Sequence, residues 1–426
     1  MKTLTIGTLT LLLVVPGALA IPRSFFGNGF FGPVIPATPR FGQNLTGDVL
    51  NLANWESGKL PGPWGESVAF AGRSSRRMTA NPILFGAVPE SVVAHSEAGT
   101  TREIAITYLD AGSFFGFKMG GERSYEERKA GDKRRAEFKG HYSKLERDLR
   151  KRLESGCGRG AVRSIGRSDA LRCSATDFRW EDFVIRLAAR EGHSLGLSIF
   201  RHGDQPLGYL DDEIAKLGTD GRADRLADSV TENQRGDVLV GELPVVQQGI
   251  TPFCGIGSLS MVAQHLGLEV PAGALEAGAA FRNTGSARGS GILELYHAVA
   301  EELCMRLTPS SKFDPRRVQR SIDAGIPVVV WRRVTKDREA AHNLFAKRLA
   351  ANSDAHLPEP TSGQRAAWPE RKKQSIPSHG SVVTGFNAEH SEVIFTEPWG
   401  ETARDRRMRV EEMEATAYAV FYFRFR

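Results

Sequence analysis

The chain has 426 residues, of which 41% are hydrophobic and 25% charged, an ordinary globular composition with enough apolar residues for two or three domains. The formal net charge is +6, which favours contact with anionic cell-envelope polymers or acidic substrates. No stretch approaches the roughly 18 consecutive apolar residues that a membrane-spanning helix needs. The composition therefore excludes a multi-span membrane protein and a disordered chain.

Residues 1–20 have the pattern of a secretory signal peptide. They contain one basic residue, an apolar run from Leu11 to Val15, and the small-residue ending Ala18-Leu19-Ala20. We therefore expect cleavage after Ala20 and a secreted or periplasmic protein with no integral membrane segment after cleavage. Export also argues against nucleic acid as a partner.

Three further regions precede the first chemical motif. Residues 21–81 are rich in Phe, Gly and Pro without periodicity, which predicts an extended, turn-rich segment. Residues 82–203 predict a small α+β domain, either a binding module or an inhibitory pro-region, and residues 204–240 a connector. In the α+β region, strand patterns fall at 91–96, 103–109, 170–174, 183–189 and 195–201, and one face of a charged helix carries Phe138, Tyr142, Leu145, Leu149 and Leu153.

The segment from Gln248 to Gly257 carries the first chemical motif. Apolar residues at helical spacing follow it: Ile256, Leu259, Val262, Ala263 and Leu266. They predict a helix with Cys254 in its first turn, where unpaired N–H groups and the helix dipole favour a thiolate. Gln248, six residues earlier, can add a side-chain N–H to the backbone N–H of Cys254. Two such donors make an oxyanion hole, so Cys254 is the candidate nucleophile and Gln248 the candidate oxyanion donor.

The other cysteines suggest structural roles. Cys157 and Cys173 flank a Gly/Arg/Ser-rich loop and are candidates for a disulfide. Cys304 ends a helical pattern and is interpreted as a buried helical thiol. No Cys/His group has the spacing of a zinc site, so we expect neither metal nor cofactor.

Helical patterns alternate with short strands after the Cys254 helix. Helices are predicted at 272–281, 292–305 and 315–324, and strands at 305–307 and 328–331. Residues 335–378 then form an insertion with a helical stretch and a Pro/Gly/Ser-bearing loop. Because the insertion ends at the next motif, we expect it to form a wall or lid of the cleft.

Two β-rich runs near the C-terminus predict an antiparallel hairpin that carries the base. If Phe386 pairs with Glu392, His379 falls opposite Trp399, and Glu397 becomes its diagonal neighbour on the same face. A carboxylate there can hold the imidazole in the tautomer that accepts a proton from Cys254.

The remaining histidines are poorer candidates for the base. His265 lies about 16 Å from Cys254 along the same helix. His297 is assigned to packing, and His342, His356 and His390 to the surface.

The motif Gln-Gly-x4-Cys at a helix start resembles that of papain-like cysteine peptidases. The continuation Cys254-Gly-x2-Ser-Leu-x-Met-Val, Gly325-x-Pro-Val-x-Val and His379-Gly-x-Val-Val resemble the bacteriocin-processing (double-glycine leader) peptidases and their bacterial relatives. The resemblance covers residues 241–426 and implies helices followed by an antiparallel sheet. Glu397-Pro398 stands where the family usually has Asp or Asn before Pro, and Phe253 where it commonly has Asp.

Together these features predict an α+β protein with a papain-like cysteine peptidase domain at 241–426. Its expected function is hydrolysis of a peptide or protein substrate by Cys254, His379 and Glu397, with Gln248 as oxyanion donor. Typical members of this family are fused to membrane exporters, whereas we expect no membrane segment here after signal cleavage. We therefore do not assign leader-peptide cleavage to this protein. The alternatives are an amidase or transglutaminase-type acyl transferase acting on cell-envelope peptides, an inactive peptide-binding pseudoenzyme, and a structural envelope protein.

Overall fold

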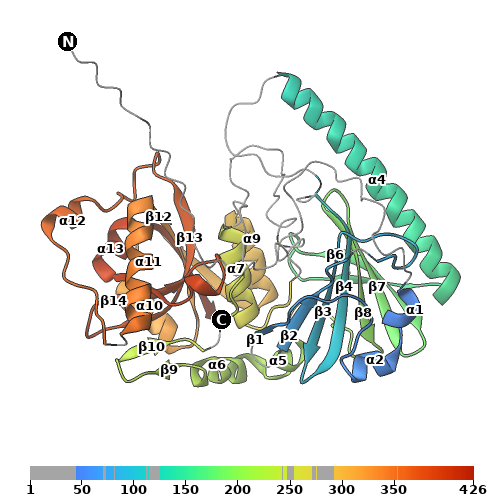
Figure 1. Ribbon diagram of the computed structural model, residues 1–426, viewed down its shortest axis with the longest axis horizontal. Coiled ribbons are helices and arrows are strands. Elements are labelled where there is room, and N and C mark those ends of the chain that lie inside the picture. The colour runs from blue at the N-terminus through green and yellow to red at the C-terminus, as the bar shows by residue number, and fades with distance from the viewer. Residues whose placement is uncertain are drawn as a thin grey trace, which may run out of the picture.

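The computed structural model describes residues 45–426 except 71–72, 81, 112–113, 115–124, 242, 247–253, 271–274, 276–291 and 353. The predicted signal peptide, residues 21–44 of the Phe/Gly/Pro-rich segment, Gln248 and all but residue 275 of the predicted helix 272–281 lie outside the described residues. Two antiparallel sheets dominate the described chain, with helices α7 and α9 between them (Figure 1). The α+β class predicted from the sequence is confirmed. Within the described residues, no helix is long and apolar enough to cross a membrane.

The first sheet forms the N-terminal half of the molecule. Its strand order is β1-β2-β3-β4-β8-β7-β6-β5. The strands are β1 (Val68–Phe70), β2 (Arg73–Arg77), β3 (Ser91–Glu97), β4 (Thr100–Asp110), β5 (Ala161–Ile165), β6 (Cys173–Trp180), β7 (Phe183–Arg190) and β8 (Ser194–Arg201).

One face of this first sheet is covered by helices. Short helices α1 (Thr46–Val49) and α2 (Leu52–Glu56) pack there through the fully buried Trp55, and the long helix α4 (Tyr125–Cys157) lies beside them. The apolar stripe predicted for α4 is buried at Phe138, Tyr142, Leu149 and Leu153. The charged remainder of the helix faces solvent, as an amphipathic surface helix requires.

The second sheet forms the C-terminal half. Its order is β11-β16-β12-β13-β10-β9, and β14 pairs with β13 and β15. The strands are β9 (Thr231–Glu232), β10 (Asp237–Leu239), β11 (Met305–Ser310), β12 (Val328–Arg333), β13 (Ser378–Asn387), β14 (Glu392–Thr396), β15 (Arg406–Arg409) and β16 (Ala417–Phe425). The predicted connector thus supplies two strands, β9 and β10, which extend this sheet.

The hairpin of β13 and β14 differs from the predicted register at its turn. Phe386 pairs with Val393 and not with Glu392, so the predicted pairing there is wrong. A β-bulge at Thr384 then shifts the register by one residue, and Val382 pairs with Thr396. The predicted register, extended along the strands, also places Val382 opposite Thr396 and His379 opposite Trp399. The bulge therefore restores the expected alignment where the histidine lies.

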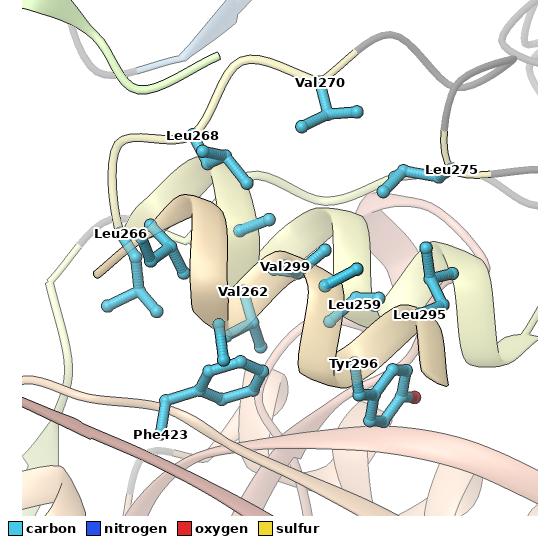
Figure 2. Close-up of a cluster of buried hydrophobic side chains, with 14 of the residues drawn as sticks. Leu259, Val262, Leu266, Leu268, Val270, Leu275, Leu295, Tyr296, Val299 and Phe423 are labelled. Carbon is cyan, nitrogen blue, oxygen red and sulfur yellow. The ribbon is translucent and has the colours of Figure 1, made fainter. Parts of the chain in front are cut away.

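Helices α7 (Cys254–His265) and α9 (Ile292–Glu302) pack against one face of the second sheet. Figure 2 shows Leu259 and Val262 of α7 beside Leu295 and Val299 of α9, with Phe423 of the sheet beneath them. The same core continues into the first half of the chain through Ile165, Leu171, Cys173, Ala175, Tyr209 and Leu210. One apolar core therefore joins the two sheets.

The other helices are shorter or lie outside this core. They are α5 (Asp212–Lys216), α6 (Gly218–Asp228), α10 (Pro315–Asp323), α11 (Lys336–Ala351), α12 (Ser362–Ala366), α13 (Val410–Thr416) and the 3-10 turn Glu401–Ala403. Helix α11, in the predicted insertion, packs against β15, and its Glu339 accepts a hydrogen bond from Arg332 of β12. In Figure 1, α11 and α7 lie on opposite sides of the second sheet, so this helix does not cover Cys254. For the rest of the insertion, the expected wall or lid stays a prediction.

The structure also corrects the interpretation of three cysteines. Cys157 and Cys173 are free, and they belong to different apolar cores, so the expected disulfide is absent among the described residues. Cys304 follows α9 with a positive φ of 53° and is partly exposed, so it is not a buried helical thiol. Its sulfur lies 3.0 Å from Arg167 Nη1.

Candidate active site

Cys254 is the first residue of α7 and lies against Gly380 of β13. A Cβ atom on Gly380 would come within 3.3 Å of the Cys254 carbonyl oxygen, so a glycine permits this close approach. Two hydrogen bonds hold the helix start in place. Ser258 Oγ donates to the Gly380 carbonyl at 2.8 Å, and Tyr296 OH donates to the Gly255 carbonyl at 3.1 Å. Strand β13 and helix α9 therefore hold the first turn of α7 in place.

His379 and Glu397 lie together next to this cysteine, as the sequence predicted. His379 Nε2 is 2.7 Å from Glu397 Oε2, and both side chains are buried. The Trp399 indole covers the imidazole, with ring centroids 4.5 Å apart. Since Nε2 faces Glu397, Nδ1 is the ring nitrogen left for Cys254. The order is thus thiol, imidazole, carboxylate, which is the arrangement of an activated nucleophile.

The three groups shift one another's protonation. Burial by itself raises the pKa of Cys254, but the hydrogen bond and charge of His379 outweigh it, so the pKa lies below the ordinary thiol value. Burial alone would lower the pKa of His379, whereas Glu397 and Cys254 raise it to about 9. For Glu397, burial is outweighed by His379 and Arg332, and its pKa is lowered. At neutral pH the arrangement therefore favours thiolate, imidazolium and carboxylate.

Glu397 is held by groups that the sequence did not reveal as part of a site. Its Oε1 accepts hydrogen bonds from Ser381 Oγ at 2.9 Å and from the Arg332 guanidinium. Arg332 also donates to Glu339 Oε1 of α11 at 2.9 Å, and Arg406 donates to Glu339 Oε2 at 2.8 Å. Arg332 is 2% exposed and Glu397 is 0% exposed. The Glu397 carboxylate is thus held by hydrogen bonds at Oε1 and by the ion pair with His379 at Oε2.

One sequence signal could have identified Arg332. It follows the apolar run Val328–Trp331 at a position that alternation places on the buried face of the strand, where an arginine needs a carboxylate partner. Glu339 carries no comparable signal, because it lies in a highly charged helix whose orientation depends on tertiary packing.

The other predicted residues have mixed outcomes. Gln248 lies outside the described residues, so its role stays a prediction. His265 is buried with Nε2 2.9 Å from the Gly325 carbonyl oxygen, far along α7. His342 was assigned to the surface, but it is 2% exposed and lies 3.1 Å from Glu412 Oε1. His297 was assigned to packing but is exposed. Among the described histidines, the predicted base His379 is the one whose side chain interacts with Cys254.

Comparison with known proteins finds a family similarity in the C-terminal half. Residues 240–424 match the model described as "Peptidase_C39 like family". No curated protein matches the chain. Two solved structures are similar: the peptidase domain of Streptococcus ComA, described as a bi-functional ABC transporter involved in a quorum-sensing pathway, and a putative C39-like peptidase from Bacillus anthracis.

The two structural similarities are distant. The Streptococcus domain is 15% identical, with a TM-score of 0.25, and the match covers 42% of this chain and 97% of that one. The Bacillus protein is 16% identical, with a TM-score of 0.28, and the match covers 44% of this chain and 96% of that one. The family match, at residues 240–424, begins directly after β10 and extends into β16, so it includes Cys254, His379 and Glu397. These residues therefore form a relative of the papain-like C39 peptidases, and the chain carries a cysteine peptidase domain.

Proposed function

We propose that the protein is an exported thiol peptidase in which Cys254 attacks peptide bonds, His379 acts as acid and base, and Glu397 orients His379. The contact between His379 Nε2 and Glu397 Oε2, at 2.7 Å beside Cys254, carries this assignment. A structural histidine needs no buried carboxylate on one side and a cysteine on the other. The lowered pKa of Cys254 and the raised pKa of His379 support the same roles.

The reaction follows from these positions. The Cys254 sulfur attacks the carbonyl carbon of the scissile amide, and the carbonyl oxygen becomes negative. The backbone N–H of Cys254 and the side chain of Gln248 are the proposed donors to that oxygen. His379 gives its proton to the leaving nitrogen, the C–N bond breaks, and a thioester remains on Cys254. Water then loses a proton to His379 and hydrolyses the thioester.

Glu397 keeps the imidazole aligned during both proton transfers. Its negative charge stabilises the imidazolium, and its second oxygen is held by Ser381 and Arg332, so the carboxylate does not rotate away. Trp399 excludes water from one face of the imidazole. The proposed export rests on the signal-peptide pattern of residues 1–20.

The pH dependence of alkylation by iodoacetamide tests the proposal. The labelled cysteine is identified by peptide mapping in the wild type, in His379→Ala and in Glu397→Gln. We expect selective labelling of Cys254 that persists well below the free-thiol pKa of about 8.5 and is lost in His379→Ala. Cys304, which is partly exposed, serves as the internal control.

Two other results would point to a different function. Labelling of Cys254 only near the free-thiol pKa, unchanged by His379→Ala, would favour the peptide-binding pseudoenzyme. A reactive Cys254 that incorporates amines into peptides without cleaving them would favour acyl transfer.

A further inference from the structure

The sheet face next to Cys254 continues beyond the first turn of α7. Trp331 of β12 pairs with Gly380, the residue beneath Cys254, and Arg333 pairs with Ser378, two residues further out. Side chains at positions 331 and 333 share one face of the strand. Helix α7 runs from Cys254 in the other direction, toward Gly325. Arg333 therefore lies on the same face of the sheet as Cys254, beyond the point where α7 begins.

A bulge brings a second aromatic ring to the same place. In the pairing of β12 with β16, Trp331 lies opposite Ala419 and Arg332 opposite Ala417, so Tyr418 is the extra residue. Bulges of this kind redirect a side chain and are common near active sites. The Tyr418 ring packs edge-on to Trp331, with centroids 6.5 Å apart, and lies 4.5 Å from the Arg333 guanidinium carbon. The three half-buried side chains form what we call the 331/333/418 shelf.

Hydrogen bonds connect the shelf to the catalytic residues at both ends. Trp331 Nε1 donates to Tyr296 OH at 3.2 Å, and Tyr296 donates to the carbonyl of Gly255, the residue after the nucleophile. Tyr418 is hydrogen-bonded to Ser378, the residue before His379. A peptide bound across Cys254 thus has the shelf within a few residues of its scissile bond, since each extended residue spans about 3.3 Å.

Arg333 differs from most of its charged neighbours in having no acidic partner. Its guanidinium donates to the carbonyls of Arg371 at 3.2 Å and Ile376 at 2.9 Å, and no carboxylate of the described residues lies within ion-pair distance. The adjacent Arg332, in contrast, bonds two carboxylates. Lys372 and Lys373, exposed on the loop that holds Arg333, form no ion pair within the described chain either. The positive charge of Arg333 is therefore left for another molecule.

We propose that the 331/333/418 shelf is a substrate subsite in which Arg333 binds a carboxylate of the peptide substrate. The aromatic rings of Trp331 and Tyr418 support the aliphatic part of that residue and exclude water, which strengthens the ion pair. The carboxylate comes from an Asp or Glu side chain or from a C-terminus near the scissile bond. This inference rests on the proposed peptidase function and specifies its substrate class.

The test is a selectivity measurement on an octapeptide library in which Glu or its uncharged isostere Gln is fixed at each position in turn, with free or amidated C-termini. At one peptide position, we expect the wild-type kcat/KM for the Glu peptide to be roughly tenfold higher than for the Gln peptide. If the bound carboxylate is the C-terminus, the same ratio is expected between the peptide with a free C-terminus and its amide. Arg333→Met should abolish that ratio, and Arg333→Lys should keep part of it. Arg424→Met, an exposed change at the far end of β16, is the matched control and should leave the ratio intact.

A ratio separates selectivity from general damage, because a loss of folded protein lowers both rates equally. Equal ratios in the wild type and Arg333→Met would overturn the proposal. Binding of the same peptides to the Cys254→Ala variant is measured by fluorescence anisotropy. This measurement distinguishes failure of the subsite proposal from failure of the peptidase assignment. Arg333-dependent preference for the carboxylate in binding, without turnover by the wild type, would support the subsite and reject the peptidase function.

Discussion

Arg332 and Glu397 form a buried ion pair directly behind the His379 imidazole. The Arg332 guanidinium bonds Glu397 Oε1, while Glu397 Oε2 lies 2.7 Å from His379 Nε2. The carboxylate therefore interacts with a permanent cation on one side and with a titrating group on the other. Its position and its charge therefore depend both on His379 and on the buried Arg332 behind it.

Glu397→Gln should shift the alkaline limb of the pH–activity profile to lower pH. The pKa of His379 is raised to about 9, with Glu397 the largest cause that raises it. The imidazolium required for leaving-group protonation is lost as the pH rises through that value, so wild-type activity should fall near pH 9. Without the carboxylate the imidazolium is less stable, and the limb moves toward the ordinary value of 6.5.

Glu397→Asp is the companion variant for this prediction. It keeps the charge but is shorter by one C–C bond, about 1.5 Å, and cannot reach His379 and Arg332 together. We expect it to retain more of the alkaline shift than Glu397→Gln while losing activity. The profile of kcat/KM between about pH 5 and pH 10 measures both effects. An unchanged limb in Glu397→Gln would contradict the orienting role.

Glu339→Gln should produce the same shift from a greater distance. Glu339 bonds both Arg332 and Arg406, and Arg406 Nη1 lies 3.7 Å from Glu397 Oε1. Removing its charge leaves two cations to act on Glu397, so the potential at His379 becomes more positive and its pKa falls. In the proposed mechanism, a helix of the insertion thus helps to position Glu397, the carboxylate that orients His379.

The matched control for Glu339→Gln is Glu401→Gln, which removes an exposed carboxylate paired with Arg404. We expect no displacement of the alkaline limb in this control. A loss of activity in Glu339→Gln at all pH values, without displacement of the limb, would indicate a purely structural role.

Gly380→Ala should reduce activity more than stability. The new methyl group would meet the Cys254 carbonyl oxygen at 3.3 Å and the Gly255 Cα at 3.4 Å, both backbone atoms, so the start of α7 must move by a few tenths of an ångström. Small displacements of a nucleophile are costly, and we expect roughly a tenfold loss in kcat. Gly363→Ala, whose Cβ would have open space apart from a side-chain atom at 3.9 Å, is the control. Full activity in Gly380→Ala would contradict the tight contact.

Glu302→Ala should destabilise the junction between the two halves. Glu302 Oε1 accepts hydrogen bonds from Arg167 N at 2.6 Å, Ser168 N at 2.9 Å and Ser168 Oγ at 3.1 Å. The substitution leaves the two buried donors of Ser168 unpaired, and we expect a loss of about 2–4 kcal/mol in the free energy of unfolding. Urea denaturation measures it. The neighbouring Glu301→Ala is exposed and should change the stability little; equal effects of the two substitutions would argue against the junction contact.

Local sequence patterns predicted most helices and strands of residues 241–426 and the placement of Cys254 and His379 on them. The thiol at a helix start and the histidine on a β-hairpin each have a short-range signature, namely helical spacing after Cys254 and strand alternation after His379. The hairpin register was predicted correctly near His379 and wrongly at its turn. A bulge changes the pairing without changing the residue pattern, so alternation alone does not locate it.

The support of Glu397 could not be predicted in the same way. Glu339 and Arg406 come from separate segments, and only tertiary packing brings them together. His342 illustrates the same limit: its charged neighbours in sequence suggested the surface, yet the fold buries it beside Glu412. A charge becomes informative when the element around it is already known to be buried, as for Arg332 at the end of a buried strand.

The apolar core that joins the two sheets has a consequence for how the chain can be processed. Ile165, Leu171 and Ala175 of the first half pack into the same cluster as α7 and α9. Proteolytic removal of residues 45–203 would expose apolar surface on α7, the helix that begins with Cys254. Such exposed apolar surface favours aggregation. Maturation by complete release of this half is therefore disfavoured, and the two halves should melt as one cooperative unit.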